Sequence, residues 1–453
     1  MTTLPILYEI FLESSGVSTD TRSVKENQLF FALKGDNFDG NKFAYQALEK
    51  GASHVVVDDK SVIPSIGDEH NAKKLAHKNR YLLVENVLES LQKLANFRRK
   101  QFSIPFIGIT GSNGKTTTKE LLRSVLSQKF KTYSTEGNLN NHIGVPLTLL
   151  RIPQEAEIAI IEMGANKVGD IAELCSIAEP SHGLITNIGN AHLEGFGGYE
   201  GVLRGKTELY QSLIKNNGTV FINSNDNVLM NMTKRFEKEK VIQYGTDNQE
   251  NYYSAKLLQS VPTIVYQDEK DNPITTQLIG AYNFSNILAA LACGKYFGLS
   301  NEQMNKGISE YLPKNNRSQV EERSNTKNTL ILDAYNANPD SMKAALRHLE
   351  EMPSKEKQKV AILGDMFELG RKSFSKHKEI LDFALQLKID KLIVCGKDFT
   401  KAKTAGNLIS SLIMSFNDKN ELADYLQKNP INESIVLLKG SRGIGLETVA
   451  DEF

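Results

Sequence analysis

The chain has 453 residues, which predicts two to four domains rather than one. Its composition, 40% hydrophobic and 24% charged, is that of an ordinary soluble globular protein. Lys+Arg and Asp+Glu both number 54, so no bulk field would attract nucleic acid or an anionic membrane. No apolar run approaches the roughly 20 residues of a membrane span. The first residues lack a basic leader and a small-residue cleavage site, so we expect no signal peptide.

The cysteines are odd in number, far apart and set among apolar residues: Cys175, Cys293 and Cys395. This pattern argues against a disulfide framework and against a metal site. We expect buried, reduced thiols in a cytoplasmic protein.

The first hundred residues mix short extended runs with helical patterns. The expected strands are Gln28–Leu33, His54–Val57 and Tyr81–Val84, and a helix is expected over Lys42–Lys50. A charged helix, Val87–Lys100, resembles a connector to the next part of the chain. We therefore expect a small α/β domain over residues 1–100.

Strands and helices then alternate over residues 101–314. The expected elements are an apolar strand at Ile104–Thr110, further buried strands at Ile158–Ile161, Gly183–Ile188 and Thr219–Asn223, and a helix at Asn283–Phe297. Alternation of this kind predicts a parallel sheet with helices on both faces. Ligands bind such sheets at the carboxyl ends of the strands, where Glu162 and His192 follow their strands.

A second α/β series begins near residue 316. Its expected strands are Leu330–Leu332, Val360–Leu363, Leu392–Val394 and Ile435–Leu438. The preceding stretch, Tyr311–Ser318, carries a proline and two asparagines, and we expect a hinge there. The third domain is thus expected over residues 315–453.

The most informative motif is TGSNGKTTT, which begins at Thr110 after an apolar strand and opens a helix near Lys115. Its two glycines allow the backbone to approach a ligand closely, and a helix N-terminus favours phosphate. Lys115 would reach the β- and γ-phosphates, and Thr116 would ligate Mg²⁺. The spacing is a variant, because Ile109 occupies the place of the usual first glycine; an ordinary glycine turn is the alternative. The expected nucleotide-binding residues of the loop are Thr110, Gly111, Ser112, Asn113, Gly114, Lys115, Thr116 and Thr117.

Three further residues each have two interpretations. Glu162 at a strand end is either a Mg²⁺ ligand or, as is more common there, a cap or a solvated group. His192 lies in a glycine-rich loop, where functional groups gather, but a single histidine is usually structural. From the residues alone, two interpretations of Lys206 are equally good: a solvated helix lysine and a functional group.

The sequence DAYNANP, from Asp333 to Pro339, suggests either a nucleotide contact or an Asx turn before proline. In the first case Asp333 would accept from ribose hydroxyls and Tyr335 would stack near a base. Asn283 is a natural N-cap for the helix that contains Asn286. Arg317, in the expected hinge, is either a γ-phosphate clamp that arrives on closure or a surface residue.

Together these motifs resemble the Mur ligases, the ATP-dependent amide-forming enzymes of peptidoglycan precursor synthesis. The resemblance covers essentially the whole chain. Besides the loop, it rests on EMGAN, NIGNAHLEGFG, YNFSN, DAYNANP and LGDMFELG. The runs EGNLNNHIGVPLTLL, HLEGFGGYEGVLRGKTELY and LKGSRG resemble the branch that joins D-alanyl-D-alanine to UDP-N-acetylmuramoyl-tripeptide.

The resemblance implies three α/β domains: a UDP-binding domain, a central P-loop-type ATPase domain and a C-terminal Rossmann-like lid. It implies catalytic roles for Lys115, His192, Lys206 and Arg317, and a carbamylated lysine at Lys206. It also implies ATP and two Mg²⁺ ions as cofactors. The implied metal ligands are Thr116, Glu162, His192 and Lys206, and the implied nucleotide contacts outside the loop are Asn283, Asn286, Arg317, Asp333 and Tyr335.

The substrate-binding residues implied by the resemblance are Ser18, Asp20, Thr21, Arg22, Asn138 and Asn141. The chain departs from the family's pattern in two places: Asn316 precedes Arg317 where the family often has glycine, and Asn41 stands where it often has histidine. The implied partners are small-molecule substrates, with neither nucleic acid nor a membrane span, and we expect a monomer. The rival interpretations are a sibling ligase of the family, a folylpolyglutamate synthetase, and a nucleotide switch that hydrolyses ATP without forming an amide.

Overall fold

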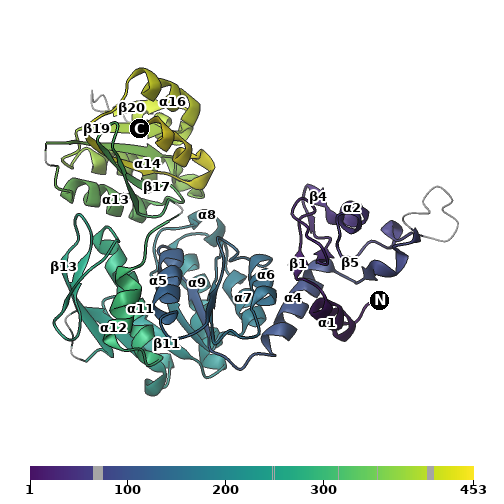
Figure 1. Cartoon of the computed structure of the whole chain (residues 1–453). Helices are drawn as coiled ribbons and strands as arrows, with labels where there is room; N and C mark the ends of the chain where they lie inside the picture. Colours follow the sequence, from purple (N-terminus) through teal and green to yellow (C-terminus); the bar gives the residue numbers. More distant parts are fainter. Residues whose placement is uncertain (65–74, 247, 249, 315, 355, 406–412) are drawn as a thin grey trace. The chain divides into compact units, whose positions relative to one another are not determined.

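A computed structural model describes residues 1–64, 75–246, 248, 250–314, 316–354, 356–405 and 413–453. It divides into two compact units (Figure 1). The first comprises residues 1–108, 131–164 and 170–182, and the second comprises residues 109–130, 165–169 and 183–453. Within the described ranges, no helix is long and apolar enough to cross a membrane.

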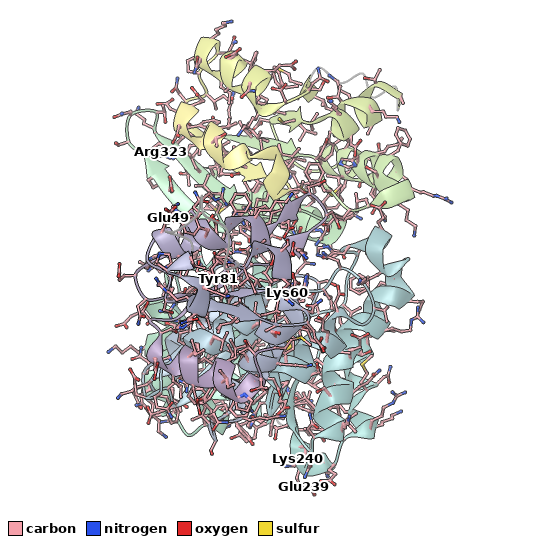
Figure 2. The ribbon with its side chains drawn as sticks, turned by 90° about the vertical axis from the view of Figure 1, so that its right-hand side faces the viewer. Glu49, Lys60, Tyr81, Glu239, Lys240 and Arg323 are labelled. Carbon is pink, nitrogen blue, oxygen red and sulfur yellow. The ribbon has the colours of Figure 1, made fainter. Side chains whose placement is uncertain are left out.

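The first unit opens with a parallel four-stranded sheet in the order β1-β2-β5-β6, with Leu29 opposite His54 and Val55 opposite Tyr81. Its inward side chains form a small core that includes Phe30 and Tyr81, of which Tyr81 is labelled in Figure 2. The strands expected here are confirmed, but the expected helix at Lys42–Lys50 begins as a 3₁₀ turn. The elements are α1 (Leu4–Glu13), β1 (Val17–Ser18), β2 (Leu29–Phe31), the hairpin β3 (Lys34–Gly35) and β4 (Phe38–Asp39), η1 (Gly40–Phe43), α2 (Ala44–Glu49), β5 (His54–Val57), β6 (Tyr81–Leu83) and α4 (Val87–Arg99).

A nine-stranded sheet follows, in the order β15-β14-β13-β12-β11-β10-β7-β9-β8. Its strands are β7 (Phe106–Thr110), β8 (Thr132–Ser134), β9 (Ile158–Glu162), β10 (His182–Ile185), β11 (Thr219–Asn223), β12 (Val241–Thr246), β13 (Tyr253–Gln259), β14 (Val265–Gln267) and β15 (Pro273–Thr275). The apolar strands expected at β7, β9, β10 and β11 are confirmed. The antiparallel extension β13-β14-β15 was not expected, because these strands carry exposed polar residues and lack an apolar run.

The helices that accompany this sheet include the expected one after the glycine loop. They are α5 (Lys115–Leu126), α6 (Gly144–Arg151), α7 (Asp170–Ala178), α8 (Leu193–Phe196), α9 (Tyr199–Lys215), α10 (Asn227–Met230), α11 (Phe284–Tyr296) and α12 (Asn301–Ser309). In the second unit α5, α11 and α12 pack against one another. On α5 the apolar residues Leu121, Leu122, Val125 and Leu126 are buried.

The end of the chain forms a six-stranded sheet in the order β16-β17-β21-β18-β19-β20, with only the β16 edge antiparallel. One face is covered by α13, α14 and α15 around an aliphatic core that includes Leu346, and the other by α16 and η10 around Leu438 (Figure 1). The four expected strands are confirmed. The elements are β16 (Gln319–Arg323), β17 (Asn328–Asp333), α13 (Pro339–Glu351), β18 (Gln358–Gly364), η8 (Gly370–Lys372), α14 (Ser373–Ala384), β19 (Lys391–Cys395), α15 (Lys397–Ala405), β20 (Ile413–Phe416), α16 (Lys419–Lys428), β21 (Ser434–Lys439), η9 (Arg442–Ile444) and η10 (Leu446–Glu452).

All three cysteines are buried, as expected, and none of them is part of a disulfide. Position 315, within the stretch expected to be a hinge, lies outside the described residues. The domain boundaries at residues 100 and 314 remain predictions, since the compact units divide the chain elsewhere.

Candidate functional site

The glycine loop between β7 and α5 needs both of its glycines. Gly111 has φ of +145° and Gly114 has φ of +79°, backbone conformations that side chains rarely adopt. A Cβ on Gly111 would lie 2.0 Å from Thr186 Oγ1, and one on Gly114 would lie 2.8 Å from Asn286 Oδ1. The loop therefore fits closely against two neighbouring segments, which an ordinary glycine turn would not require.

The segment after β10 holds the loop in place. Ser112 N donates to Asn187 O and Asn113 N donates to Asn187 Oδ1, both at 3.0 Å. Gly189 N donates to Ser112 Oγ at 2.9 Å. The amides of Ser112 and Asn113 therefore point at protein oxygens, and the binding of phosphate by this loop remains a prediction.

Lys115 folds back over the loop, where its Nζ donates to Gly111 O at 2.7 Å. Thr116, the expected Mg²⁺ ligand, is buried in the first turn of α5. The two side chains thus lie at the helix N-terminus, where its dipole favours an anion.

Asn283 and Asn286 support the loop from behind. Asn286 Oδ1 accepts from Thr118 Oγ1 at 3.1 Å, and its Nδ2 donates to Asn283 Oδ1 at 2.9 Å. Asn283 occupies the N-cap position of α11, as expected, but its side chain makes no capping hydrogen bond, and its Nδ2 donates instead to Ile279 O at 2.9 Å. Both asparagines are buried, so they fix the position of α5 relative to α11.

His192 begins α8 in a left-handed conformation, with φ of +52°. Its Nδ1 pairs with the carboxylate of Glu368, which also has positive φ, +62°. Glu194 N donates to Glu368 O at 3.3 Å. The pairing lowers the pKa of Glu368 below its usual value. It leaves Nε2 as the ring nitrogen that His192 could offer to a metal.

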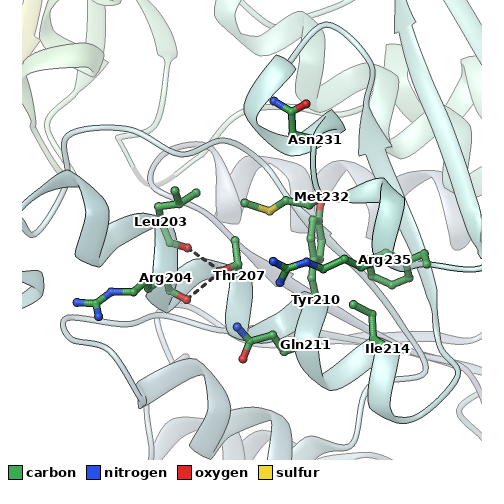
Figure 3. Close-up of a pocket in the computed structure, with 10 residues that line it drawn as sticks. Leu203, Arg204, Thr207, Tyr210, Gln211, Ile214, Asn231, Met232 and Arg235 are labelled. Carbon is green, nitrogen blue, oxygen red and sulfur yellow. Dashed lines mark hydrogen bonds between the residues drawn. The ribbon is translucent and has the colours of Figure 1, made fainter.

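Lys206 is fully buried, so the alternative of a solvated helix lysine is wrong. Its Nζ lies 3.3 Å from Ala165 O and 5.2 Å from the centre of the Phe196 ring. A cavity of about 260 Å³ lies along α9 (Figure 3). Lys206 is not among its lining residues, so this cavity is separate from the expected site. The lining includes Leu203, Thr207, Tyr210 and Arg235.

In the first unit, Glu162 ends β9 with only 1% of its surface exposed, so the alternative of a solvated group is wrong. Its Oε1 accepts from Asn140 Nδ2 at 2.8 Å, and its backbone N donates to Thr135 Oγ1 at 3.0 Å. Asn141, expected to bind substrate, accepts from Ile143 N and Gly144 N at the start of α6. Asn138 is exposed.

Asp333, at the carboxyl end of β17, accepts from Lys439 Nζ at 2.6 Å and from Ser318 N at 3.2 Å. Arg317 lies against the Tyr335 ring, with its guanidinium carbon 3.6 Å from the ring centre. The nucleotide contacts expected of these residues remain predictions. Asn338 rather than Asp333 makes the turn before the proline, capping α13 through Ser341.

The expected UDP motif forms a tight turn after β1. Ser18 Oγ donates to Asp20 O, and Asp20 forms a bidentate pair with Arg22 that lowers its pKa to about 2. Thr21 O accepts from Lys50 Nζ at 2.9 Å. The Arg22 side chain is 88% exposed, so the turn presents a cation to solvent.

The two departures from the family's pattern have structural explanations. Asn41 is buried, donates to Asp39 and Asp58, and accepts from the amides of Asp58 and Asp59. Asn316 has φ of +55°, and asparagine is among the residues that best tolerate the conformation that glycine would adopt there. Arg317 therefore follows the same kind of turn that glycine provides.

In the described part of the chain, no three His, Cys, Asp or Glu side chains form a group that could hold a metal. The expected ligand set contains only two residues of these types, Glu162 and His192, and is completed by Thr116 and Lys206. A carboxylate and a hydroxyl supply oxygen atoms, which are the ligands that Mg²⁺ prefers. The metal set remains a prediction.

Sequence reasoning missed the residues that join distant segments. Asn338 Nδ2 donates to Asn113 Oδ1 at 2.6 Å, and Asp340 accepts from Asn190 N at 2.8 Å. Asn before Pro and Asp in a first helical turn are visible capping signals. Neither signal indicates which loop the side chains reach.

Comparisons with known proteins show which family the chain is similar to. The chain matches family models described as "Mur ligase family, catalytic domain" over residues 13–99, "Mur ligase middle domain" over 109–294, and "Mur ligase, glutamate ligase domain" over 316–442. It is 34% identical to the UDP-N-acetylmuramoyl-tripeptide–D-alanyl-D-alanine ligase of Bacillus subtilis (96% of this chain, 92% of the relative). It is 33% identical to the ligase of the same name from Escherichia coli (96% and 92%).

Solved structures are similar over the whole chain. A crystal structure of MurF from Acinetobacter baumannii has a TM-score of 0.83 at 28% identity, covering 99% of this chain and 98% of that one. MurF from Thermotoga maritima in complex with ADP has a TM-score of 0.81 at 27% identity, covering 98% and 97%. The three-domain α/β fold expected from the sequence is therefore confirmed. This chain belongs to the Mur ligase family.

Proposed function

We propose that this protein joins D-alanyl-D-alanine to UDP-N-acetylmuramoyl-tripeptide, converting ATP to ADP and phosphate. The observation that carries this proposal is the similarity to ligases of that name over 96% of the chain, and over 92% of the first relative's own length. A sibling ligase or a folylpolyglutamate synthetase is less well supported, because the solved structures at 27–28% identity are also MurF. An amide ligase of this kind serves peptidoglycan precursor synthesis.

The reaction needs ATP because a carboxylate is a poor electrophile. The terminal carboxylate of the tripeptide attacks the γ-phosphorus, the bond to the β-phosphate oxygen breaks, and ADP leaves. The resulting acyl-phosphate has a good leaving group. The free amine of the dipeptide then attacks the acyl carbon, and the tetrahedral intermediate collapses to amide and phosphate.

In this scheme the loop from Thr110 to Thr117 holds the phosphates of ATP. Lys115 lies over the loop and would move from Gly111 O to the phosphate oxygens. Asn283 and Asn286 hold α5 in position behind it. The role of these groups is to fix the γ-phosphate in line with the attacking carboxylate, the main requirement for phosphoryl transfer.

We expect Mg²⁺ to be held by Thr116, Glu162 and His192. When bound, Mg²⁺ would neutralise the charge on the phosphates. Glu162 is buried and held by Asn140, and His192 is held by Glu368, so each side chain has a fixed direction. Lys206 joins this set as a carbamate in our proposal. Its complete burial supports this, since burial disfavours an ammonium ion and only an uncharged amine reacts with carbon dioxide.

Arg317 would bind the transferred phosphate from the C-terminal domain. Its position after the segment Tyr311–Asn316 suits a group that reaches the site on domain closure, which also excludes the water that would hydrolyse the acyl-phosphate. Asp333 and Tyr335, next to Arg317, would contact the ribose and base. Ser18, Asp20, Thr21 and Arg22 would bind the UDP end of the substrate, where the exposed Arg22 offers a cation to the diphosphate.

The test is to incubate the protein with ATP, Mg²⁺, UDP-N-acetylmuramoyl-tripeptide and D-alanyl-D-alanine, and to measure pentapeptide and ADP. Single D-amino acids, meso-diaminopimelate, lysine and glutamate serve as alternative acceptors. Amide formation only with one of those would assign a sibling activity, and ATP hydrolysis without any amide would assign a nucleotide switch. Folded protein that gives no pentapeptide would overturn the proposal.

Two variants test the assigned residues. Lys206→Ala should lose turnover, and a short carboxylic acid added to the assay should restore part of it by replacing the carbamate. Arg317→Ala should lose turnover far more than substrate affinity. We further propose that the protein acts as a monomer in the cytoplasm, where ATP is available. Sedimentation with and without substrates tests the oligomeric state.

A further inference from the structure

The cavity of about 260 Å³ beside α9 lies outside the site that the proposed reaction uses. One wall is α9 itself, and the other is the segment of residues 231–236, directly after α10 ends at Met230. Both walls belong to the second compact unit. None of the residues expected to bind ATP, Mg²⁺ or UDP lines the cavity. It is therefore a separate feature of the fold, to which the reaction gives no role.

The wall formed by α9 is a stripe along one helix face. Its residues recur at intervals of three or four, the spacing that aligns side chains on an α-helix: Leu203, Thr207, Tyr210 and Ile214. Ile214 is 39% exposed, so part of this stripe is accessible from solvent. Lys206 is on the same helix but packs against the Phe196 ring instead. A ligand on the stripe would thus contact α9 without contacting the expected reaction site.

The interior of the cavity is mainly apolar. Met232 and Phe236 lie on the wall opposite α9, and the Phe236 ring meets the Tyr210 ring edge to face, with ring centres 5.8 Å apart. Thr207 Oγ1 donates to Leu203 O at 2.9 Å (Figure 3), so its proton is already used within the helix. The unbranched side chain of methionine adapts readily to the shape of a ligand. These walls therefore suit an apolar molecule.

Arg235 supplies a positive charge to the cavity. Figure 3 shows its guanidinium group extending from the 231–236 segment towards α9, whereas the Arg204 side chain points away from the cavity. Arg235 is exposed, and within the described ranges no carboxylate pairs with it. A guanidinium group without an acidic partner can donate two parallel hydrogen bonds to a carboxylate. The cavity thus combines apolar walls with a cation that is available to an anion.

The size and charge of the cavity define the ligand that fits it. An apolar cavity of about 150 Å³ holds one benzene molecule, so about 260 Å³ suits an apolar body of roughly ten heavy atoms. A nucleotide or free phosphate would leave the apolar walls uncovered, and a neutral hydrocarbon would make no use of Arg235. Apolar walls with a few polar groups are the usual form of a small-molecule site.

We propose that this cavity binds a small carboxylate with an aromatic or branched aliphatic body. The carboxylate pairs with Arg235, and the apolar body lies between the α9 stripe and the side chains of Met232 and Phe236. This site goes beyond the proposed function, because it is separate from the residues expected to bind ATP and the UDP substrate. Its ligand lies against the helix that carries Lys206.

The probe is 3-phenylpropionate, and its neutral amide, 3-phenylpropanamide, is the comparison. A titration followed by ligand NMR should give a Kd on the order of 1 mM for the acid, as expected of a molecule of about eleven heavy atoms. The amide should bind about tenfold more weakly, because it loses the charge-assisted hydrogen bonds to Arg235. Saturating ADP should not displace the acid. Absence of binding, equal affinity for acid and amide, or displacement by ADP would each overturn the proposal.

Arg235→Gln should lower the affinity for the acid to that for the amide and leave the affinity for the amide unchanged. Arg204→Gln is the matched control, because Arg204 is an exposed arginine that lines the same cavity but points away from it. This variant should keep the preference for the acid. An unchanged preference in Arg235→Gln, or a lost preference in Arg204→Gln, contradicts the assignment of the carboxylate to Arg235.

Met232→Trp should fill the cavity and abolish the binding of both probes. Ile214→Trp, at a more exposed position of the lining, covers the case in which the first variant fails to fold. Unchanged binding in a folded tryptophan variant would place the probe elsewhere and overturn the proposal. The titrations measure binding alone, so their outcome does not depend on whether the protein forms an amide, and a failure of the proposed function is distinguishable from a failure of this site.

Discussion

Replacing Gly111 by alanine should disable the phosphate loop without unfolding the protein. The new Cβ would lie 2.0 Å from Thr186 Oγ1 and 3.0 Å from Thr186 N, whereas ordinary contacts begin at 3.4 Å. Thr186 Oγ1 must therefore move by more than an ångström, and the Thr186 backbone by a few tenths of an ångström. Thr186 Oγ1 donates to Asn113 O at 2.5 Å, so moving it also breaks a bond that shapes the loop.

The magnitude follows from two contributions. An alanine at φ of +145° costs on the order of 1–3 kcal/mol in backbone strain. A displacement of about 1 Å at a phosphoryl-transfer site costs on the order of 10²-fold in rate. We therefore expect kcat/KM for ATP to fall by roughly 10²-fold or more, with a lower thermal midpoint.

Gly16→Ala is the control that separates the effect of backbone strain from the effect of a steric clash. Gly16 has φ of +120°, but no atom lies within 4 Å of its would-be Cβ. This variant should lose stability and keep its KM for ATP. Steady-state kinetics, calorimetry with ADP and thermal unfolding are measured for both variants. A folded Gly111→Ala protein with unmodified kcat/KM would refute the assignment of this loop to the phosphates.

Three further outcomes are expected. Glu368→Ala should weaken the binding of Mn²⁺, an ion used here in place of Mg²⁺, because His192 loses the carboxylate that directs its ring. A titration followed by paramagnetic resonance measures the Mn²⁺ affinity. An unchanged affinity would remove Glu368 from the site. His348 is buried with both ring nitrogens unpaired among the described residues, which lowers its pKa from 6.5 to about 4. The contribution of His348 to the free energy of unfolding is therefore complete above pH 6.5 and is lost as the pH falls towards 4, in total about 3 kcal/mol. Hydrogen exchange in α13 should show this loss, and His348→Leu should abolish it. Equal pH dependence in both proteins would contradict the prediction. Asn41→Ala should destabilise the N-terminal domain by about 2 kcal/mol, because the Asp58 carboxylate and backbone amide each lose a hydrogen-bond partner. Amide hydrogen exchange in β5 measures this loss. Unchanged exchange would contradict the structural role of Asn41.

Local patterns were sufficient for the elements that build the site. An apolar run, a glycine turn and a helical spacing predicted β7, the loop and α5, because each signal depends only on neighbouring residues. The strands β17, β18, β19 and β21 were predicted for the same reason. The strands β13 to β15, at one end of the central sheet, escaped notice because their exposed residues lack the apolar contrast on which such predictions rest.

Side-chain roles were harder to predict. Asn283 has the residue type of an N-cap, but the tertiary structure uses its amide to join Ile279 and Asn286. Lys206 has an ordinary helical setting in the sequence, and only packing against Phe196 and Ala165 shows that it is buried. A residue's type limits the bonds it can make, whereas its neighbours in space decide which of them it makes.

The sequence by itself determined the α/β class, the phosphate loop and the resemblance to one ligase family, because these depend on periodicity and on short motifs. Only the tertiary structure decided that Glu368 meets His192 and that Tyr335 holds Arg317 and Arg442 together. Arg442 comes 107 residues after Tyr335, so no local pattern connects them. They meet because β17 and β21 are neighbours in one parallel sheet, whose strand ends bring distant loops to the same edge.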